Sequence, residues 1–196
     1  MAMGRAHDRA TALLALPFGL LWGPALGPAG IAVASLAFLL GGLWLSPDLD
    51  TPSRALARWG PMRGLWWPYR RLLRHRSLLS HSPLIGTAGR LAYLLIALAG
   101  VRLVAEAGPW PPLPLPPLGE WPALGGGLWR AHPAWVLCAL TGLEASSWLH
   151  LLQDGDPLPK VPRPLRWLLG RAAHRSPRRG RPGGRRPATG RKGRRA

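Results

Sequence analysis

Two pairs of ionisable residues in this chain have a spacing that suits metal binding. His150 and Asp154 are four residues apart in "HLLQD", which on a helix puts both side chains on one face, about one turn apart. Asp48 and Asp50 are two apart in "SPDLD", and in an extended segment after Pro47 they would point the same way. Carboxylates held this close repel each other unless a cation lies between them. The two pairs therefore predict a divalent metal site, with Zn, Mn or Fe as the ion.

Further histidines and one more acid extend this set. His7 and Asp8 lie in "GRAHDR", and His75 and His81 lie in "HRSLLSH". Each motif alone has a simpler explanation. A DxD is usually a solvated helix end, an HxxxD is often a structural pair, and a histidine among arginines can face anionic lipid. The case for metal depends on all the motifs meeting at one place in the fold.

The charge distribution indicates what surrounds these residues. The chain has 196 residues, of which 47% are hydrophobic and 17% charged, and its net charge is +18. Residues 10–53 hold no Lys or Arg, residues 54–90 hold eight, residues 103–159 hold one, and fourteen follow from position 160. Such a charge implies an anionic partner, either nucleic acid or a membrane surface. The single cysteine, Cys138, excludes an internal disulfide and a cysteine-based zinc site.

The apolar blocks predict an all-α fold, a four-helix membrane-embedded bundle. We expect helices at about 10–22, 29–46, 84–106 and 134–153, with a Gly/Pro turn at 23–30 between the first two. A span requires about 20 apolar residues. The second and fourth segments come close to this, the first is short and the third is charged at its flanks. A soluble all-α bundle is the alternative.

The basic blocks predict how such a bundle would be oriented. Loops rich in Lys and Arg stay cytoplasmic, so the 47–83 loop and both termini are expected inside, in the inner (cytoplasmic) membrane of a bacterium, with 108–127 outside. The candidate ligands then all lie at the cytoplasmic end. The inner interface would hold four tryptophans, Trp44, Trp59, Trp66 and Trp67. Residues 1–160 form the helical domain, and 161–196 a disordered basic tail that attracts anionic lipid headgroups. "RRGRP" (178–182) resembles a minor-groove-binding motif, so nucleic acid is a second partner for the tail.

The same motifs carry a family resemblance over residues 4–156. The order "GRAHDR", "SPDLD", "HRSLLSH", "GLEASSWLHLLQDG" resembles a bacterial family of uncharacterised metal-binding membrane proteins. More distantly it is similar to LexA-binding, inner-membrane metal-dependent hydrolases, although the His75–His81 spacing is one residue longer here. The resemblance implies these metal ligands: His7, Asp48, Asp50, His75, His81, His150 and Asp154.

Seven ligands exceed the four of a structural zinc site, so we expect one or two ions, with Asp50 or Asp154 bridging a pair. Arg76 would stabilise a developing anion or contact a lipid headgroup. Asp8 and Glu144 would orient an imidazole, or Glu144 would pair with an arginine of the neighbouring helix.

Three functions follow from this set of residues. The first is a metal-dependent hydrolase that acts on a phosphoester at the cytoplasmic face, with Asp50, Asp154 and Arg76 in catalytic roles. The second is a non-enzymatic membrane protein with a structural metal site. The third is a membrane-tethered nucleic-acid-binding protein that acts through its tail.

Overall fold

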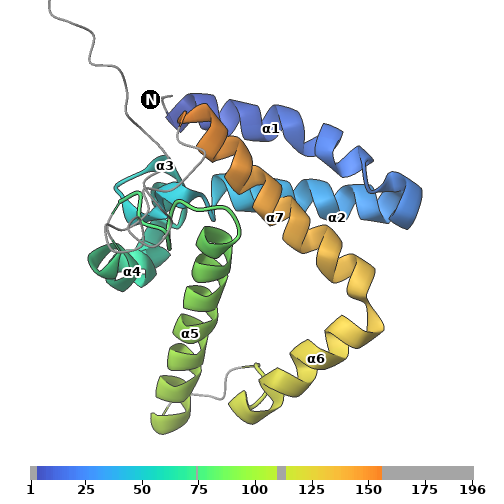
Figure 1. The fold of residues 1–196 in the computed structure, drawn as a ribbon. Coiled ribbons are helices and arrows are strands. Elements are labelled where there is room, and N and C mark those ends of the chain that lie inside the picture. Colours follow the sequence, from blue (N-terminus) through green and yellow to red (C-terminus); the bar gives the residue numbers. More distant parts are fainter. Residues whose placement is uncertain (1–3, 74, 110–113, 156–196) are drawn as a thin grey trace, which may run out of the picture. The chain divides into compact units, whose positions relative to one another are not determined.

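The computed structural model describes residues 4–73, 75–109 and 114–155, and within these ranges the protein is all-helical (Figure 1). The predicted fold class, all-α, is confirmed for this part of the chain. The predicted basic tail lies outside the described residues. The elements in chain order are α1 (Gly4–Leu20), α2 (Gly23–Leu43), η1 (Pro47–Asp50), α3 (Arg54–Arg58), η2 (Gly60–Trp66), α4 (Trp67–Leu72), α5 (Ile85–Ala107), η3 (Leu118–Glu120), α6 (Trp121–Ala131) and α7 (Pro133–Gln153).

The first two helices differ from their predicted bounds. Helix α1 starts at Gly4 rather than near residue 10, so His7 and Asp8 lie within it. Helix α2 starts at Gly23, inside the predicted turn. It bends at Gly27, which has a φ of 63° and is followed by Pro28. Glycine tolerates this positive φ and proline cannot continue a straight helix. The Gly/Pro segment therefore bends α2, and the turn between the helices lies before it.

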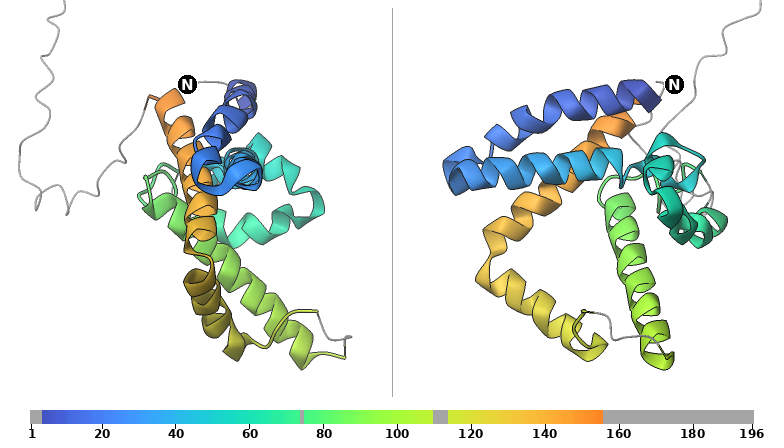
Figure 2. Two further views of the ribbon diagram at one scale, coloured as in Figure 1. Left: turned by 90° about the vertical axis from the view of Figure 1, so that its right-hand side faces the viewer. Right: turned by 180° about the vertical axis from the view of Figure 1, so that it is seen from behind.

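Helix α2 packs against α1 on one side and α7 on the other (Figures 1 and 2). Small residues let α2 and α7 approach closely. A Cβ built on Gly142 would lie 2.8 Å from the Cβ of Ala37 and 2.9 Å from the carbonyl oxygen of Ala34. Such small-residue contacts are typical of helix pairs in membranes.

We expect Gly142→Ala to destabilise the fold by about 1–3 kcal/mol, because the added methyl group meets backbone that cannot move aside. The matched control is Gly100→Ala on α5, where an added Cβ meets nothing within 4 Å. That change should be neutral or stabilising by up to about 1 kcal/mol, since alanine favours helix. Thermal unfolding of both variants in detergent checks the prediction, and equal effects would show that the α2–α7 contact is not close-packed.

Helix α5 is the least covered of the long helices. Only 11% of its most apolar stretch is buried inside the protein. The large side chains of Leu95, Ile96 and Val104 are exposed. Thr87 and Arg90, in its first two turns, form hydrogen bonds to Ser147 of α7. Beyond these turns α5 diverges from α1 and α2 (Figures 1 and 2). Three helical segments of the described chain are long and apolar enough to cross a membrane: 23–50, 85–107 and 133–153. Helix α1 is not among them, so the four-helix bundle stays a prediction.

The segment between α2 and α5 folds around an aromatic core. Trp66 is fully buried, and its ring lies within about 5.3 Å of the rings of Trp59, Tyr69 and Tyr93. Leu49, next to the two aspartates, belongs to the same cluster. Trp66 is therefore covered by protein and is not a lipid-exposed anchor, and its depth in a membrane stays a prediction. This tryptophan supports the segment that carries Asp48 and Asp50.

Candidate metal centre

Asp48 and Asp50 lie in a single turn of 3₁₀ helix, η1, and not in the extended segment that the sequence predicted. Pro47 occupies the first position of that turn, and the hydroxyl of Ser46 accepts a hydrogen bond from the backbone N–H of Asp48. Proline at the first position with a serine cap before it is a standard helix start. Both carboxylates reach His81, while Asp50 also contacts His75 and Asp48 also contacts His150, so the "SPDLD" motif serves two groups of partners.

The first group consists of Asp48, Asp50, His75 and His81. Ligand atoms from these four residues lie within 4.8 Å of one another. Asp50 joins both histidines, with Oδ1 3.0 Å from Nδ1 of His75 and Oδ2 3.4 Å from Nδ1 of His81. The rings of His75 and His81 meet edge to face, with centroids 4.8 Å apart. His81 and Asp50 are buried, whereas His75 is exposed.

The second group consists of His7 from α1 and His150 and Asp154 from the end of α7. Here too one ligand atom of each residue lies within 4.8 Å of the others. Asp154 contacts both imidazoles, at 3.2 Å from Nε2 of His7 and 3.7 Å from Nε2 of His150. The predicted pairing of His150 and Asp154 across one helical turn is thus confirmed. The imidazole rings of His7 and His150 are stacked, with their centroids 4.1 Å apart.

Asp48 connects the two groups. Its Oδ1 lies 3.5 Å from Nε2 of His81 and also 3.5 Å from Nε2 of His150. The sequence prediction named Asp50 or Asp154 as the bridging carboxylate, but the residue that reaches both groups is Asp48. The structure brings all seven candidate ligands into one continuous set of contacts, at the end of the chain's helices where α1 begins and α7 ends (Figure 1).

This donor set fits a divalent cation. The Nε2 atoms of His81 and His150 and the Oδ2 atom of Asp50 are buried without a hydrogen-bond partner. Buried polar atoms without partners are costly, and each one requires an explanation. Imidazole nitrogens and carboxylate oxygens directed at a common centre are the ligands of Zn, Mn and Fe sites.

Three outer residues, which the sequence did not single out, contact the second nitrogen of three imidazoles. Nδ1 of His7 lies 2.8 Å from Oε1 of Gln153. Nδ1 of His150 lies 3.4 Å from the hydroxyl of Ser46, and Nδ1 of His81 lies 3.1 Å from that of Ser80. The amide oxygen of Gln153 accepts from Nδ1–H of His7 and so leaves its Nε2 for a ligand, and the serine hydroxyls orient the other two rings. Their only signal in the sequence is adjacency to a candidate ligand or its turn.

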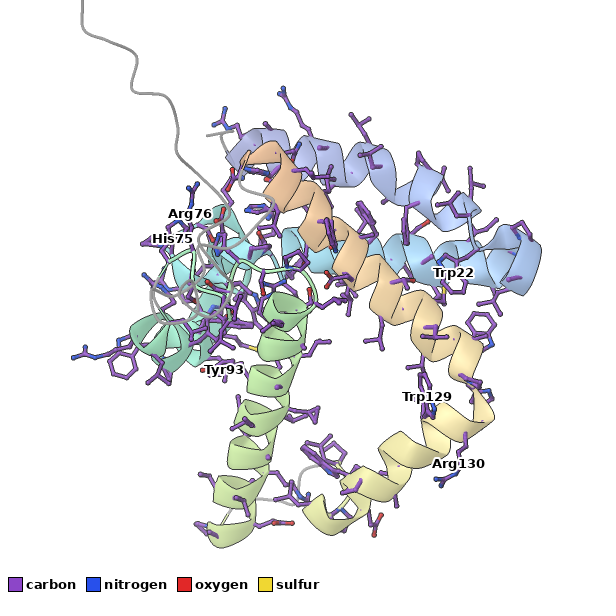
Figure 3. The ribbon with its side chains drawn as sticks, viewed as in Figure 1. Trp22, His75, Arg76, Tyr93, Trp129 and Arg130 are labelled. Atoms are coloured by element: carbon purple, nitrogen blue, oxygen red, sulfur yellow. The ribbon has the colours of Figure 1, made fainter. Side chains whose placement is uncertain are left out.

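The other predicted site residues have different partners. Asp8 orients no imidazole. Its Oδ2 forms ion pairs with Arg54 and Arg58, at 2.7 and 2.6 Å, and so joins α1 to α3. Glu144 likewise accepts from the backbone N–H of Leu84, at the start of α5. Arg76 follows His75 in a left-handed backbone conformation, with a φ of 59°, and belongs to neither group of ligands (Figure 3).

Burial and charge act against each other at His81. Burial alone would lower the pKa of this imidazole. The close contacts with the carboxylates of Asp48 and Asp50, together with their charges, more than offset burial and raise the pKa to about 8. In the metal-free protein His81 is therefore largely protonated at neutral pH.

A half-open cavity of about 300 Å³ lies beside the cluster. His7, Asp48 and His150 line it from one side, and Thr51 and Arg54 from the other. Its volume is at the lower end of the range for ligand sites, which begins at about 300 Å³. A small polar group can thus reach the candidate ligands.

Comparison with known proteins points to the same kind of site. Residues 2–160 match the family described as "Uncharacterized metal-binding protein (DUF2227)", and the chain belongs to that family. An uncharacterized protein of Aquifex aeolicus (strain VF5) is 42% identical over 60 residues, which cover 30% of this chain and 42% of the relative. The chain thus spans less than half the length of that relative. No solved structure matches.

Proposed function

We propose that this member of a metal-binding family is a membrane-embedded hydrolase of phosphoesters that uses one or two divalent ions. The observation that carries the proposal is the convergence of two ligand groups on Asp48, beside a cavity that a substrate can enter. The more distant resemblance to inner-membrane metal-dependent hydrolases supports it. When bound, the ions would polarise a phosphoryl oxygen and supply hydroxide near neutral pH.

Each group of residues has a defined part in this proposal. His75, His81 and Asp50 hold one position, His7, His150 and Asp154 hold the other, and Asp48 contacts both. Gln153, Ser46 and Ser80 orient the imidazoles. Asp48 and His150 face the cavity, so they would contact the substrate. Arg76 is proposed to stabilise the anion that develops on the substrate.

A purely structural metal site is the alternative, and the cavity argues against it. Structural zinc sites use four protein ligands and are closed, whereas catalytic sites keep a position open. Here the Asp48 side chain is 28% exposed and lines the cavity. That access favours catalysis.

Metal analysis and a hydrolysis assay test the proposal. Full-length protein purified in detergent should hold near-stoichiometric transition metal and hydrolyse phosphoesters, and Asp48→Ala should lose both. Protein that retains metal but hydrolyses no phosphoester, and that unfolds when a chelator is added, would establish the structural alternative. Metal-free protein that cannot be reconstituted would contradict both.

Metal-free and metal-loaded protein should respond to pH in opposite ways. The pKa of His81 in the folded metal-free protein, about 8, exceeds its unfolded value of about 6.5. Protonated His81 therefore contributes about 2 kcal/mol of stability that is complete below pH 6.5 and is lost as pH rises through 8. A metal must displace that proton, so apparent affinity should rise about tenfold per pH unit up to pH 8. Melting curves and chelator competition at pH 6, 7 and 8 measure both trends, and flat affinity would exclude His81 as a ligand.

The proposed location is the bacterial cytoplasmic membrane, with the metal centre at its inner face. The exposed apolar surface of α5 and the three long apolar helices support it. A topology reporter fused after Gly119 should report the outside, and one fused after Arg63 the cytoplasm. Two reporters on the same side would contradict this orientation.

The basic segment from residue 161 is proposed to bind anionic lipid headgroups, by charge alone. Each basic residue near such a surface is worth about 1 kcal/mol. Removing residues 170–196 should flatten the salt dependence of binding to anionic vesicles and leave metal content unchanged. Loss of metal would instead place His174 in the site.

A further inference from the structure

A second cavity, beside the one at the metal centre, has a wall of arginines. Its volume is about 410 Å³, and Arg5, Asp8, Arg9 and Arg54 line it. Asp8 and Arg54 also line the cavity beside His7, Asp48 and His150. The two cavities therefore share the Asp8–Arg54 ion pair as a common wall.

Arg5 and Arg9 differ from the other basic residues nearby. Asp8 pairs with Arg54 and Arg58, which satisfies its charge and joins α1 to α3. Arg5 and Arg9 have no ion-pair partner among the described residues, and they stand four apart on α1. Two guanidinium groups at that spacing lie on one face of the helix, and they line this cavity together.

We infer that Arg5 and Arg9 form an anion subsite next to the metal centre. The inference rests on the proposed function and names its substrate class: a phosphoester that carries a second phosphate-type group beside the scissile one. With the scissile group beside Asp48 and His150, the second group lies against the arginines. Guanidinium is suited to phosphate because its N–H groups match two oxygens at once. We therefore expect a ligand with two linked phosphate groups to contact both cavities, and one with a single phosphate group to contact only one.

Binding of inorganic anions to detergent-purified, metal-loaded protein tests the subsite. Pyrophosphate should bind at least about tenfold more tightly than phosphate, since one charge-assisted contact is worth that factor. The double variant Arg5→Gln/Arg9→Gln should lose this preference and keep its metal. The matched control, Arg63→Gln/Arg71→Gln, removes the same charge from η2 and α4, away from both cavities. It should retain the preference.

Further measurements separate the source of the anion and the cause of a failure. If a short-chain lipid diphosphate, dioctanoylglycerol pyrophosphate, competes with pyrophosphate and dioctanoyl phosphatidylcholine does not, the anion is a lipid headgroup. If neither competes, the anion is a soluble diphosphate. Metal content is measured after each titration, because pyrophosphate can chelate the ion. If the purified wild-type protein held no metal, the proposed metal-dependent hydrolysis would be contradicted. The preference for pyrophosphate over phosphate, and its loss in Arg5→Gln/Arg9→Gln, would then be measured in the metal-free protein. Equal losses in both double variants, or no preference in the wild type, would overturn the subsite.

Discussion

Replacing His150 with alanine should lower metal affinity by more than about a hundredfold and abolish phosphoester hydrolysis, while the protein still inserts and folds. His150 contacts Asp48 and Asp154 through Nε2 and stacks on His7, so it borders both parts of the centre. Changes to outer partners of ligands already cost about 10- to 100-fold in affinity. Loss of a direct ligand should cost more. Metal content and affinity of the purified variant check the prediction.

A different outcome is expected for His150→Ala if His150 has a structural role and binds no metal. Asp154 would keep His7, 3.2 Å away, so the substitution does not strand a buried carboxylate. A structural role for His150 therefore predicts a modest loss of stability with metal retained. The same substitution at His132, an exposed histidine just before α7, is the control and should change neither property. Full metal in His150→Ala would remove α7 from the centre.

The predicted ends of α5 and α7 differ from the observed ends by no more than one residue. Both are long apolar runs, and α7 begins at Pro133, a residue that favours helix starts. The start of α1 was missed because Arg5, His7 and Arg9 are charged or polar and indicated a flank. All three nevertheless belong to α1, where His7 is buried at the metal centre and Arg5 and Arg9 lie on an exposed face and line the second cavity. Short helices such as α3 and α4 have too few residues for a periodicity to be visible.

The candidate site was predicted as a set of residues, and its internal arrangement was not. Apolar length and basic loops were sufficient to place the seven residues at one end. The central position of Asp48 depends on the η1 turn, which Ser46 and Pro47 build locally. The ion pairs of Asp8 depend on the packing of α3 against α1, which is set by the tertiary structure. Residues that become neighbours only through tertiary packing have no characteristic spacing in the sequence from which the contact could be predicted.

Arg90 is a buried residue that holds the loop next to His81, through the carbonyl oxygen of Ser80. It is 1% exposed, although it lies in an apolar helix. Its guanidinium donates to the carbonyl oxygen of Ser80 at 2.8 Å and to the hydroxyls of Ser147 and Thr87 at 2.7 and 3.2 Å. It thereby joins the loop that carries His81 to α5 and α7. Charged groups inside apolar segments are costly unless they have such a role.

Arg90→Met should therefore destabilise the protein by about 1–3 kcal/mol, because it leaves the buried carbonyl oxygen of Ser80 without its donor. It should also weaken metal binding by about 10- to 100-fold, because the carbonyl of Ser80 loses its donor and His81 is the next residue. Ser147→Ala removes one of the three contacts and should produce a smaller loss of both. Arg90→Lys keeps the charge and should restore part of the metal affinity. Affinity is measured at a temperature where every variant is folded, so that a direct effect on the centre is separated from unfolding. If Arg90→Met were destabilised but bound metal with wild-type affinity, Arg90 would stabilise the fold without positioning His81.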